Sequence, residues 1–134
     1  FDGAKSTATD YMNFLSMLLN KGKFMGKQIL SEASVNELLK IQTGAAVNKF
    51  TPPFFNNYAF GLGTWVENKE GTTISCNAQN APFVWVDYCR GYAAILLPKK
   101  EQDVQKRELY NQLQAAVNEQ MKAIHKELGE GEDG

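Results

Sequence analysis

Cysteine and histidine are the side chains of this sequence that are best suited to covalent catalysis. The chain holds two cysteines, Cys76 and Cys89, and one histidine, His125. A catalytic thiol needs a lowered pKa and a base beside it. His125 lies far along a predicted terminal helix, among polar neighbours that indicate solvent. We therefore favour Cys76 as a small buried apolar side chain over a Cys76–His125 catalytic pair.

The two cysteines could also form a disulfide bond. If residues 72–77 and 82–87 form a hairpin, Cys76 lies near its closed end and Cys89 lies beyond the opposite end. At ~3.3 Å per strand residue the two are roughly 15–20 Å apart, beyond the ~7 Å that a disulfide allows between Cα atoms. We predict two free thiols, and their spacing matches no metal site.

Asp10 and Asp87 are the acids that could be interpreted as a catalytic carboxylate pair. We favour a structural role for each. Asp10 falls in the first turn of a predicted helix, where the helix dipole favours an anion. Asp87 stands where a strand ends, and we expect it to form a turn.

Four aromatic residues could serve either to bind a ligand or to pack in the core. Tyr58, Phe60, Trp65 and Trp85 could line a ligand groove. Such residues are more often cross-strand pairs within a core, and we favour that interpretation.

The elements that must position these side chains follow from the periodicity of apolar residues. Two helices are predicted first. One covers residues 6–20, with Ser6 or Thr7 as N-cap and Gly22 as its left-handed stop, and a loop with Gly26 at its tip follows it. The other starts at Ser31 and ends at Gly44.

Strand patterns follow the helices. Four strands are predicted, at residues 58–66, 72–77, 82–87 and 92–97, and the short turns between them indicate an antiparallel meander. In the first of them, Gly61 and Gly63 would allow another backbone to approach closely.

A long terminal helix is predicted over residues 101–128. Its apolar stripe should cover the sheet, and at ~1.5 Å per residue its length of about 40 Å lets part of it project and meet another chain. The stripe consists of Val104, Leu109, Leu113, Val117, Ile124 and Leu128. The predicted fold is α+β, with an antiparallel sheet of three or four strands, two N-terminal helices and one C-terminal helix packed on the sheet.

Several stretches, taken in order, resemble the C-terminal part of a known family. It is the serine β-lactamase-related, penicillin-binding-protein-like group, with class C β-lactamases, D-alanyl-D-alanine carboxypeptidases and β-lactamase-fold esterases. The stretches are 6–20 with 22–23, 26–31 with 34–35, and 60–66 followed by 85–87 and 91–97. The resemblance implies a partial β-lactamase/transpeptidase-like fold, and serine hydrolysis of an amide or ester as the activity of the complete domain.

The family's chemistry uses three motifs, of which the resemblance places only one within this chain. The Ser-x-x-Lys motif and the Tyr- or Ser-based motif belong upstream of residue 1, and no serine here is followed by lysine three positions on. Without nucleophile and base, this chain alone is expected to be inactive.

The third family motif is Lys-Thr-Gly or His-x-Gly. Its position corresponds to Cys76, Asn77 and Ala78, which supply neither a cation nor a glycine. The resemblance places Gln79, Asn80 and Phe83 as residues that line the cleft.

Composition and charge narrow the remaining possibilities. Residues 1–128 are expected to form the domain part and residues 129–134 a disordered acidic tail. A net charge of −1 gives no electrostatic case for nucleic acid. No apolar run approaches a membrane span, and we expect neither cofactor nor metal. The start, which is neither a Met nor a signal peptide, suggests a processed or excised segment. The compartment stays open, although many family members are secreted or periplasmic.

Two functional hypotheses remain open. In the first, the chain is part of a serine hydrolase, and its partner is the missing N-terminal part of the same domain or another chain. In the second, the domain is catalytically degenerate and serves as a binding or structural subunit. An open sheet edge predicts that the chain is stable only with a complementary segment, and the terminal helix could form an oligomer.

Overall fold

The computed structural model describes residues 4–43, 58–67, 73–75, 82–99 and 104–130. Within them the chain forms three helices and seven short strands. In chain order the elements are α1 (Ala8–Leu19), β1 (Lys23–Phe24), β2 (Lys27–Gln28), α2 (Glu32–Leu39), β3 (Ala59–Phe60), β4 (Trp65–Val66), β5 (Thr73–Ser75), β6 (Phe83–Asp87), β7 (Tyr92–Leu96) and α3 (Val104–Glu130).

The main sheet is an antiparallel meander in the order β3-β4-β5-β6-β7. The register sets Ile74 opposite Val86 and Ser75 opposite Trp85. Strand β6 lies inside the sheet and all five of its residues are buried. Strand β7 forms one edge, and its residues are all partly exposed. The predicted α+β class with an antiparallel sheet is confirmed.

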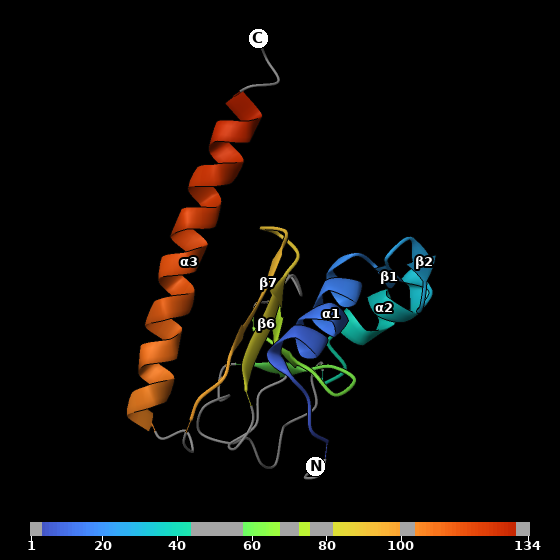
Figure 1. Cartoon of the computed structure of the whole chain (residues 1–134), viewed down its shortest axis with the longest axis horizontal. Helices are drawn as coiled ribbons and strands as arrows, with labels where there is room; N and C mark the ends of the chain where they lie inside the picture. Colours follow the sequence, from blue (N-terminus) through green and yellow to red (C-terminus); the bar gives the residue numbers. More distant parts are fainter. Residues whose placement is uncertain (1–3, 44–57, 68–72, 76–81, 100–103, 131–134) are drawn as a thin grey trace.

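Helices lie on both sides of this sheet (Figure 1). On one side, Leu15 of α1 packs with aliphatic residues of the strands into a buried core formed by Leu15, Val66, Ile74, Val84 and Val86. Because side chains alternate along a strand, Phe83 and Trp85 point to the opposite face. There α3 runs along the sheet, and its C-terminal half projects beyond the strands (Figure 1).

Helix α1 has the boundaries that its capping residues predict. The Thr7 side chain accepts a hydrogen bond from the Asp10 backbone N–H at 3.1 Å, so Thr7 is the N-cap. After the helix, Gly22 adopts a φ of +90° and its N–H bonds the Met17 carbonyl. The left-handed stop at Gly22 is therefore confirmed.

The segment between the first two helices contains a small hairpin, where only a loop was expected. Strands β1 and β2 pair Phe24 with Lys27, so Met25 and Gly26 form a two-residue turn. Both have positive φ, +48° and +77°, as a type I′ hairpin turn requires. The Met25-Gly26 pair encodes this turn less clearly than Asn-Gly would, which is why the strands escaped prediction.

The second helix ends earlier than expected. Its N-cap is Ser31, as predicted, but it ends at Leu39, and Lys40 is extended. Beyond it, the backbone N–H groups of Gln42 and Thr43 both bond the Phe60 carbonyl. These tertiary hydrogen bonds hold the chain against β3, so the helix ends before Gly44, where its end was predicted. Gly44 lies outside the described residues.

The predicted strand at residues 58–66 is a hairpin of two strands, which raises the sheet to five. Gly61 has the predicted close approach, because a Cβ there would lie 3.0 Å from the Leu38 carbonyl oxygen. Gly63 does not: it has a φ of +78° and nothing lies within 4 Å of its Cβ position. Its role is to turn the chain, and this turn divides the strand into β3 and β4.

The orientation of α3 differs from the prediction. Leu109 and Leu113 were expected to cover the sheet, but they are 59% and 43% exposed. The residues of α3 that turn toward the sheet include Arg107 and Gln114, which are 5% and 7% exposed. The reason is that the α3-facing side of the sheet carries aromatic and polar side chains, which select Arg107 and Gln114 in place of leucine.

None of the helices in the described part of the chain is sufficiently long and apolar to span a membrane.

Candidate functional site

The segment expected to carry the third family motif joins β5 to β6. Cys76, Asn77, Ala78, Gln79 and Asn80 lie outside the described residues. The described neighbours on either side, Ser75 and Phe83, are buried. The assignment of a degenerate motif to this segment therefore stays a prediction.

Phe83 is the one predicted cleft residue within the described part of the chain. It is 0% exposed and lies beneath α3. Its ring stacks on Tyr110 with centroids 5.5 Å apart, and the guanidinium carbon of Arg107 lies 4.3 Å from its centre. These contacts make Phe83 the main point at which α3 attaches to the sheet, and its part in lining a cleft stays a prediction.

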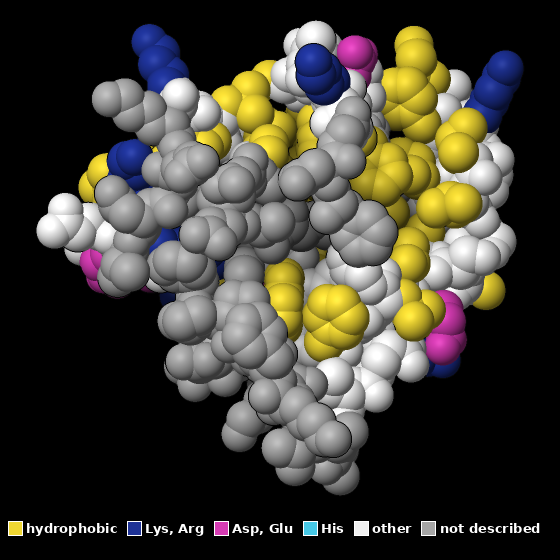
Figure 2. Space-filling view, turned by 90° about the horizontal axis from the view of Figure 1, so that it is seen from below, with side chains coloured by type: hydrophobic (Ala, Val, Ile, Leu, Met, Phe, Trp, Pro, Cys, Tyr) yellow, Lys and Arg dark blue, Asp and Glu magenta, His cyan; other side chains and the backbone are white. Residues whose placement is uncertain are grey.

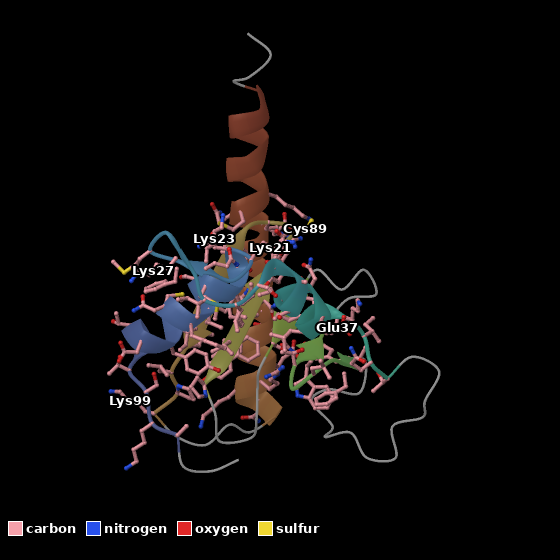
Figure 3. The ribbon with its side chains drawn as sticks, turned by 90° about the vertical axis from the view of Figure 1, so that its right-hand side faces the viewer. Lys21, Lys23, Lys27, Glu37, Cys89 and Lys99 are labelled. Atoms are coloured by element: carbon pink, nitrogen blue, oxygen red, sulfur yellow. The ribbon has the colours of Figure 1, made fainter. Side chains whose placement is uncertain are left out.

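Cys89 is exposed and forms no disulfide bond in the described structure. It follows Tyr88, whose ring lies 5.9 Å from the Lys21 ammonium. In Figure 3 Cys89 and Lys21 lie near the middle of the molecule's long axis, whereas Lys99 and Glu37 lie closer to the end opposite the C-terminal part of α3. Cys76 and the side chain of His125 are not described, so the Cys–His and disulfide questions stay as predicted.

Asp87 is a turn former, as the sequence predicted. It is 1% exposed, accepts the Arg90 backbone N–H at 2.8 Å and pairs with the Arg90 guanidinium at 2.8 Å. The hydrogen bond that the Arg90 guanidinium donates to Asp87 raises the pKa of Arg90, although desolvation opposes this shift. Asp10 is exposed in the first turn of α1. Each acid has a structural role of its own.

The aromatic residues pair across strands as expected. Phe60 and Trp65 are directly opposed, with ring centroids 4.9 Å apart. Trp85 is 1% exposed, packs edge-on against Tyr92, and donates its indole N–H to the Tyr92 hydroxyl at 2.6 Å. Phe60 and Trp65 therefore form a cross-strand pair as predicted, but Phe60 is 36% exposed, so this pair lies at the surface and not in the core. Trp85 is part of the buried interior.

A cluster of polar residues beneath α3 was not predicted. Gln114 donates its side-chain N–H to Glu67 Oε2 at 2.8 Å, across 47 positions of sequence. Buried Ser75 and Arg107 lie close to the same carboxyl, on the sheet and on α3 respectively. We call Glu67, Ser75, Arg107 and Gln114 the α3 polar cluster.

Burial governs the electrostatics of the α3 polar cluster. Desolvation raises the pKa of Glu67, and it outweighs the hydrogen bond from Gln114, the nearby Ser75 hydroxyl and the charge of Arg107, all of which lower that pKa. Desolvation also raises the pKa of Tyr58 and of Tyr92, and the charge of Glu67 adds to both. Burial therefore shifts the balance of Glu67 toward its neutral form, relative to a carboxyl in water.

A signal for this cluster exists in the sequence. Glu67 follows Trp65 by two positions, so both side chains leave β4 on one face. Arg107 and Gln114 are seven positions apart, which places them on one face of a helix. Neither signal by itself shows that the two faces meet, so none of Glu67, Arg107 and Gln114 was predicted to be functional or buried.

The α3 polar cluster does not form a hydrolase centre. Ser75 and Glu67 have the residue types of a nucleophile and a base. Ser75, however, is only 1% exposed and lies beneath α3, so a substrate cannot reach it. Its Oγ is buried and makes no well-formed hydrogen bond to any described residue, so its approach to Glu67 is not a nucleophile–base contact. Within the described residues there is also no group of three His, Cys, Asp or Glu that could hold a metal.

Comparison with known proteins gives a likeness at the level of the fold. No family model matches the chain, and no curated protein matches it. Among solved structures, the chain is similar to a Bacteroides dorei DSM 17855 protein that is provisionally assigned as a β-lactamase. The identity is 21% and the TM-score is 0.56, and the match covers 69% of this chain.

The match spans 32% of the length of that Bacteroides protein. At this identity the likeness concerns the fold alone. It shows that the helices and the antiparallel sheet are arranged as in part of a β-lactamase-like fold.

Proposed function

We propose that this chain is the C-terminal part of a β-lactamase-related serine hydrolase domain that cleaves an amide or ester. The observation that carries the proposal is the structural match, which covers 69% of this chain but only 32% of its β-lactamase-like neighbour. A chain that forms one part of such a fold leaves the rest of the domain to another segment. Residues 1–134 contain no Ser-x-x-Lys, which supports a nucleophile on that other segment.

Strand β7 supports a complementary segment beside it. Among the described residues it pairs with β6 alone, through all five positions. Its sequence, Tyr-Ala-Ala-Ile-Leu, contains none of the lysines, prolines or bulges with which edge strands usually avoid pairing. We infer that a strand from the N-terminal part of the same domain, or from a partner chain, pairs with this edge.

Exposed apolar side chains support the same inference. Hydrophobic side chains gather on the face seen in Figure 2, and the charged ones lie mainly around its rim. Large apolar residues that are more than 40% exposed occur on α1, the hairpins, the end of β7 and α3: Phe14, Met25, Ile29, Leu62, Leu97, Leu109 and Leu113. Exposed leucines on α3 also support this helix as a contact between copies of the chain.

A second function has its own support in the sequence. Cys76, Asn77 and Ala78 stand where the family places Lys-Thr-Gly or His-x-Gly. A thiol offers no positive charge to a substrate carboxylate, and alanine adds a methyl group where the family has glycine. The alternative proposal is a catalytically degenerate domain that acts as a binding or structural subunit.

Covalent labelling distinguishes the two proposals. The complete product of the gene is incubated with a fluorophosphonate and, separately, with a fluorescent penicillin. Labelling by either probe supports the hydrolase, because both need an activated serine. Silence with both probes, in a protein that is folded by circular dichroism, supports the degenerate domain.

A further inference from the structure

Helix α3 attaches to the sheet through residues that are mostly polar. The described attachments are Arg107 and Tyr110 on Phe83, Gln114 on Glu67, and Asn118, whose side-chain oxygen accepts the Tyr92 hydroxyl. Positions 107, 110, 114 and 118 recur every three or four residues and form one stripe of the helix. The leucines at 109 and 113 face away, so the attachment depends on the contacts with the Phe83 ring and on the hydrogen bonds and charges of this stripe.

Glu67 is the ionisable group at the centre of this interface. Its backbone N–H bonds the Thr73 carbonyl at 2.9 Å, which fixes it at the end of β4. One carboxyl oxygen, Oε2, accepts from Gln114. The other, Oε1, is buried and accepts no hydrogen bond from the described residues. A buried carboxylate oxygen without a donor is costly, whereas a neutral carboxyl is tolerated more easily.

The groups around Glu67 come from every element that packs against it. Tyr58 precedes β3, Ser75 lies on β5, Asp87 ends β6 and Tyr92 begins β7. From α3 come Arg107 and Gln114. Arg107 favours the charged form of Glu67, while Asp87 disfavours it, and Asp87 already pairs with Arg90. Burial of the carboxyl exceeds each of these influences.

We propose that Glu67 makes the docking of α3 on the sheet depend on protonation. While the carboxyl is neutral, α3 lies against the sheet. When the carboxyl ionises, water must reach it, and the simplest way is for α3 to move away at the turn that holds Gln114. The device is local to this interface and does not depend on the function of the whole domain.

The direction with pH follows from the pKa of Glu67. Burial raises that pKa in the docked state above the ordinary glutamate value, and we expect the pKa to fall back toward that value when α3 moves away and water reaches the carboxyl. Below the undocked value both states are protonated, and docking is strongest there. As pH rises through the docked value, the docked state loses its excess proton and docking weakens. Above the docked value Glu67 is ionised in both states, and the stabilisation of docking by protonation is completely lost.

Hydrogen exchange of the α3 amides tests this proposal in the full chain, within whatever larger protein contains it. Exchange is measured between about pH 5 and about pH 8 and corrected for the intrinsic pH dependence of amide exchange. The expected result is that α3 protection falls with rising pH, by about tenfold for each unit by which the pKa of Glu67 is raised, while β6 protection changes little. Protection that rises with pH would overturn the proposal, because it would mean that an ion pair with Arg107 dominates.

Two variants separate protonation from general loosening. Glu67→Gln keeps the shape and cannot ionise, so α3 should stay protected at every pH. Tyr92→Phe removes the hydroxyl that reaches Asn118, so protection should fall equally at every pH. A Glu67→Gln protein with the same pH dependence as the wild type would overturn the proposal.

If Glu67→Gln fails to fold, a direct titration of the Glu67 carboxyl in the wild-type protein tests the proposal instead. The carboxyl carbon of Glu67 is followed by NMR in the wild-type protein. Its midpoint should lie above that of an exposed glutamate and should coincide with the midpoint of the loss of α3 protection. A midpoint at or below the ordinary value would contradict the proposal.

Discussion

The guanidinium of Arg107 lies over the ring of Phe83, with its central carbon 4.3 Å from the ring centre. Arg107 is 5% exposed and Phe83 is fully buried, so water is largely excluded from the contact. A cation held over an aromatic ring in such surroundings stabilises a protein by about 2 kcal/mol. The contact therefore holds the N-terminal half of α3 on the sheet. The leucine stripe was expected to form this contact, but Arg107 forms it instead.

Truncation on α3 tests which face is buried. Arg107→Ala should lower the free energy of unfolding by about 2 kcal/mol, because it removes the contact with Phe83. Leu109→Ala, two residues away and 59% exposed, should change it by less than about 0.5 kcal/mol. Urea titration measures both. A larger loss for Leu109→Ala would mean that α3 faces the sheet with its leucines after all.

The two aspartates that could be mistaken for a catalytic pair should differ in their effect on stability. Asp87→Asn weakens the ion pair with Arg90 and leaves a buried turn less well satisfied, so we expect a loss of about 1–3 kcal/mol. Asp10→Asn should cost at most ~1 kcal/mol, because Asp10 is exposed and only favours the helix dipole. Thermal unfolding monitored by circular dichroism compares them. Equal losses would argue against the structural assignment of Asp87.

Two glycines with positive φ form a matched pair. Gly22→Ala places a methyl carbon 2.0 Å from the Leu30 carbonyl oxygen, so the backbone must move. Gly26→Ala has the same left-handed strain but meets no atom within 4 Å. The strain alone costs about 1–2 kcal/mol, and Gly22→Ala should lose clearly more. The difference in melting temperature measures it, and an equal decrease would show that the β1–β2 hairpin does not close on Gly22.

Much of this fold was predictable because local signals agree with the tertiary structure. Thr7, Ser31 and Gly22 mark helix ends through their own side chains or φ angles, and the aliphatic alternation of Val84 and Val86 marks a buried strand. The hairpin within residues 58–66 was missed because Gly63 turns the chain where aromatic residues continue the strand pattern. The end of α2 was missed because the bonds of Gln42 and Thr43 to Phe60 are tertiary.

The α3 polar cluster could not be predicted from polarity alone. Gln114 is buried and Glu67 is partly buried because they meet across the α3–sheet interface, and the local patterns at the two residues do not show that these two faces meet. The leucines of α3 misled the prediction for the same reason. An apolar stripe shows that a helix face seeks a partner, but not that this partner is the sheet of the same chain.

The open edge of β7 makes a prediction for the chain in solution. Residues 1–134 expressed alone should self-associate or unfold without cooperativity, because among the described residues β7 pairs with β6 alone and the proposal assigns its other edge to a complementary segment. Light scattering and a thermal melt measure this, and Leu109→Lys with Leu113→Lys should reduce any association that passes through α3. A monodisperse monomer with one cooperative transition would contradict the need for a complementary segment.

The proposal that this chain is one part of a serine hydrolase is tested most directly by locating the nucleophile. The complete gene product and residues 1–134 alone are each treated with a fluorophosphonate, digested and analysed by mass spectrometry. We predict that the label is found on a serine outside residues 1–134, and that the chain alone carries none. A label on Ser75 or any other residue of this chain, or no label on the folded complete protein, would contradict the proposal.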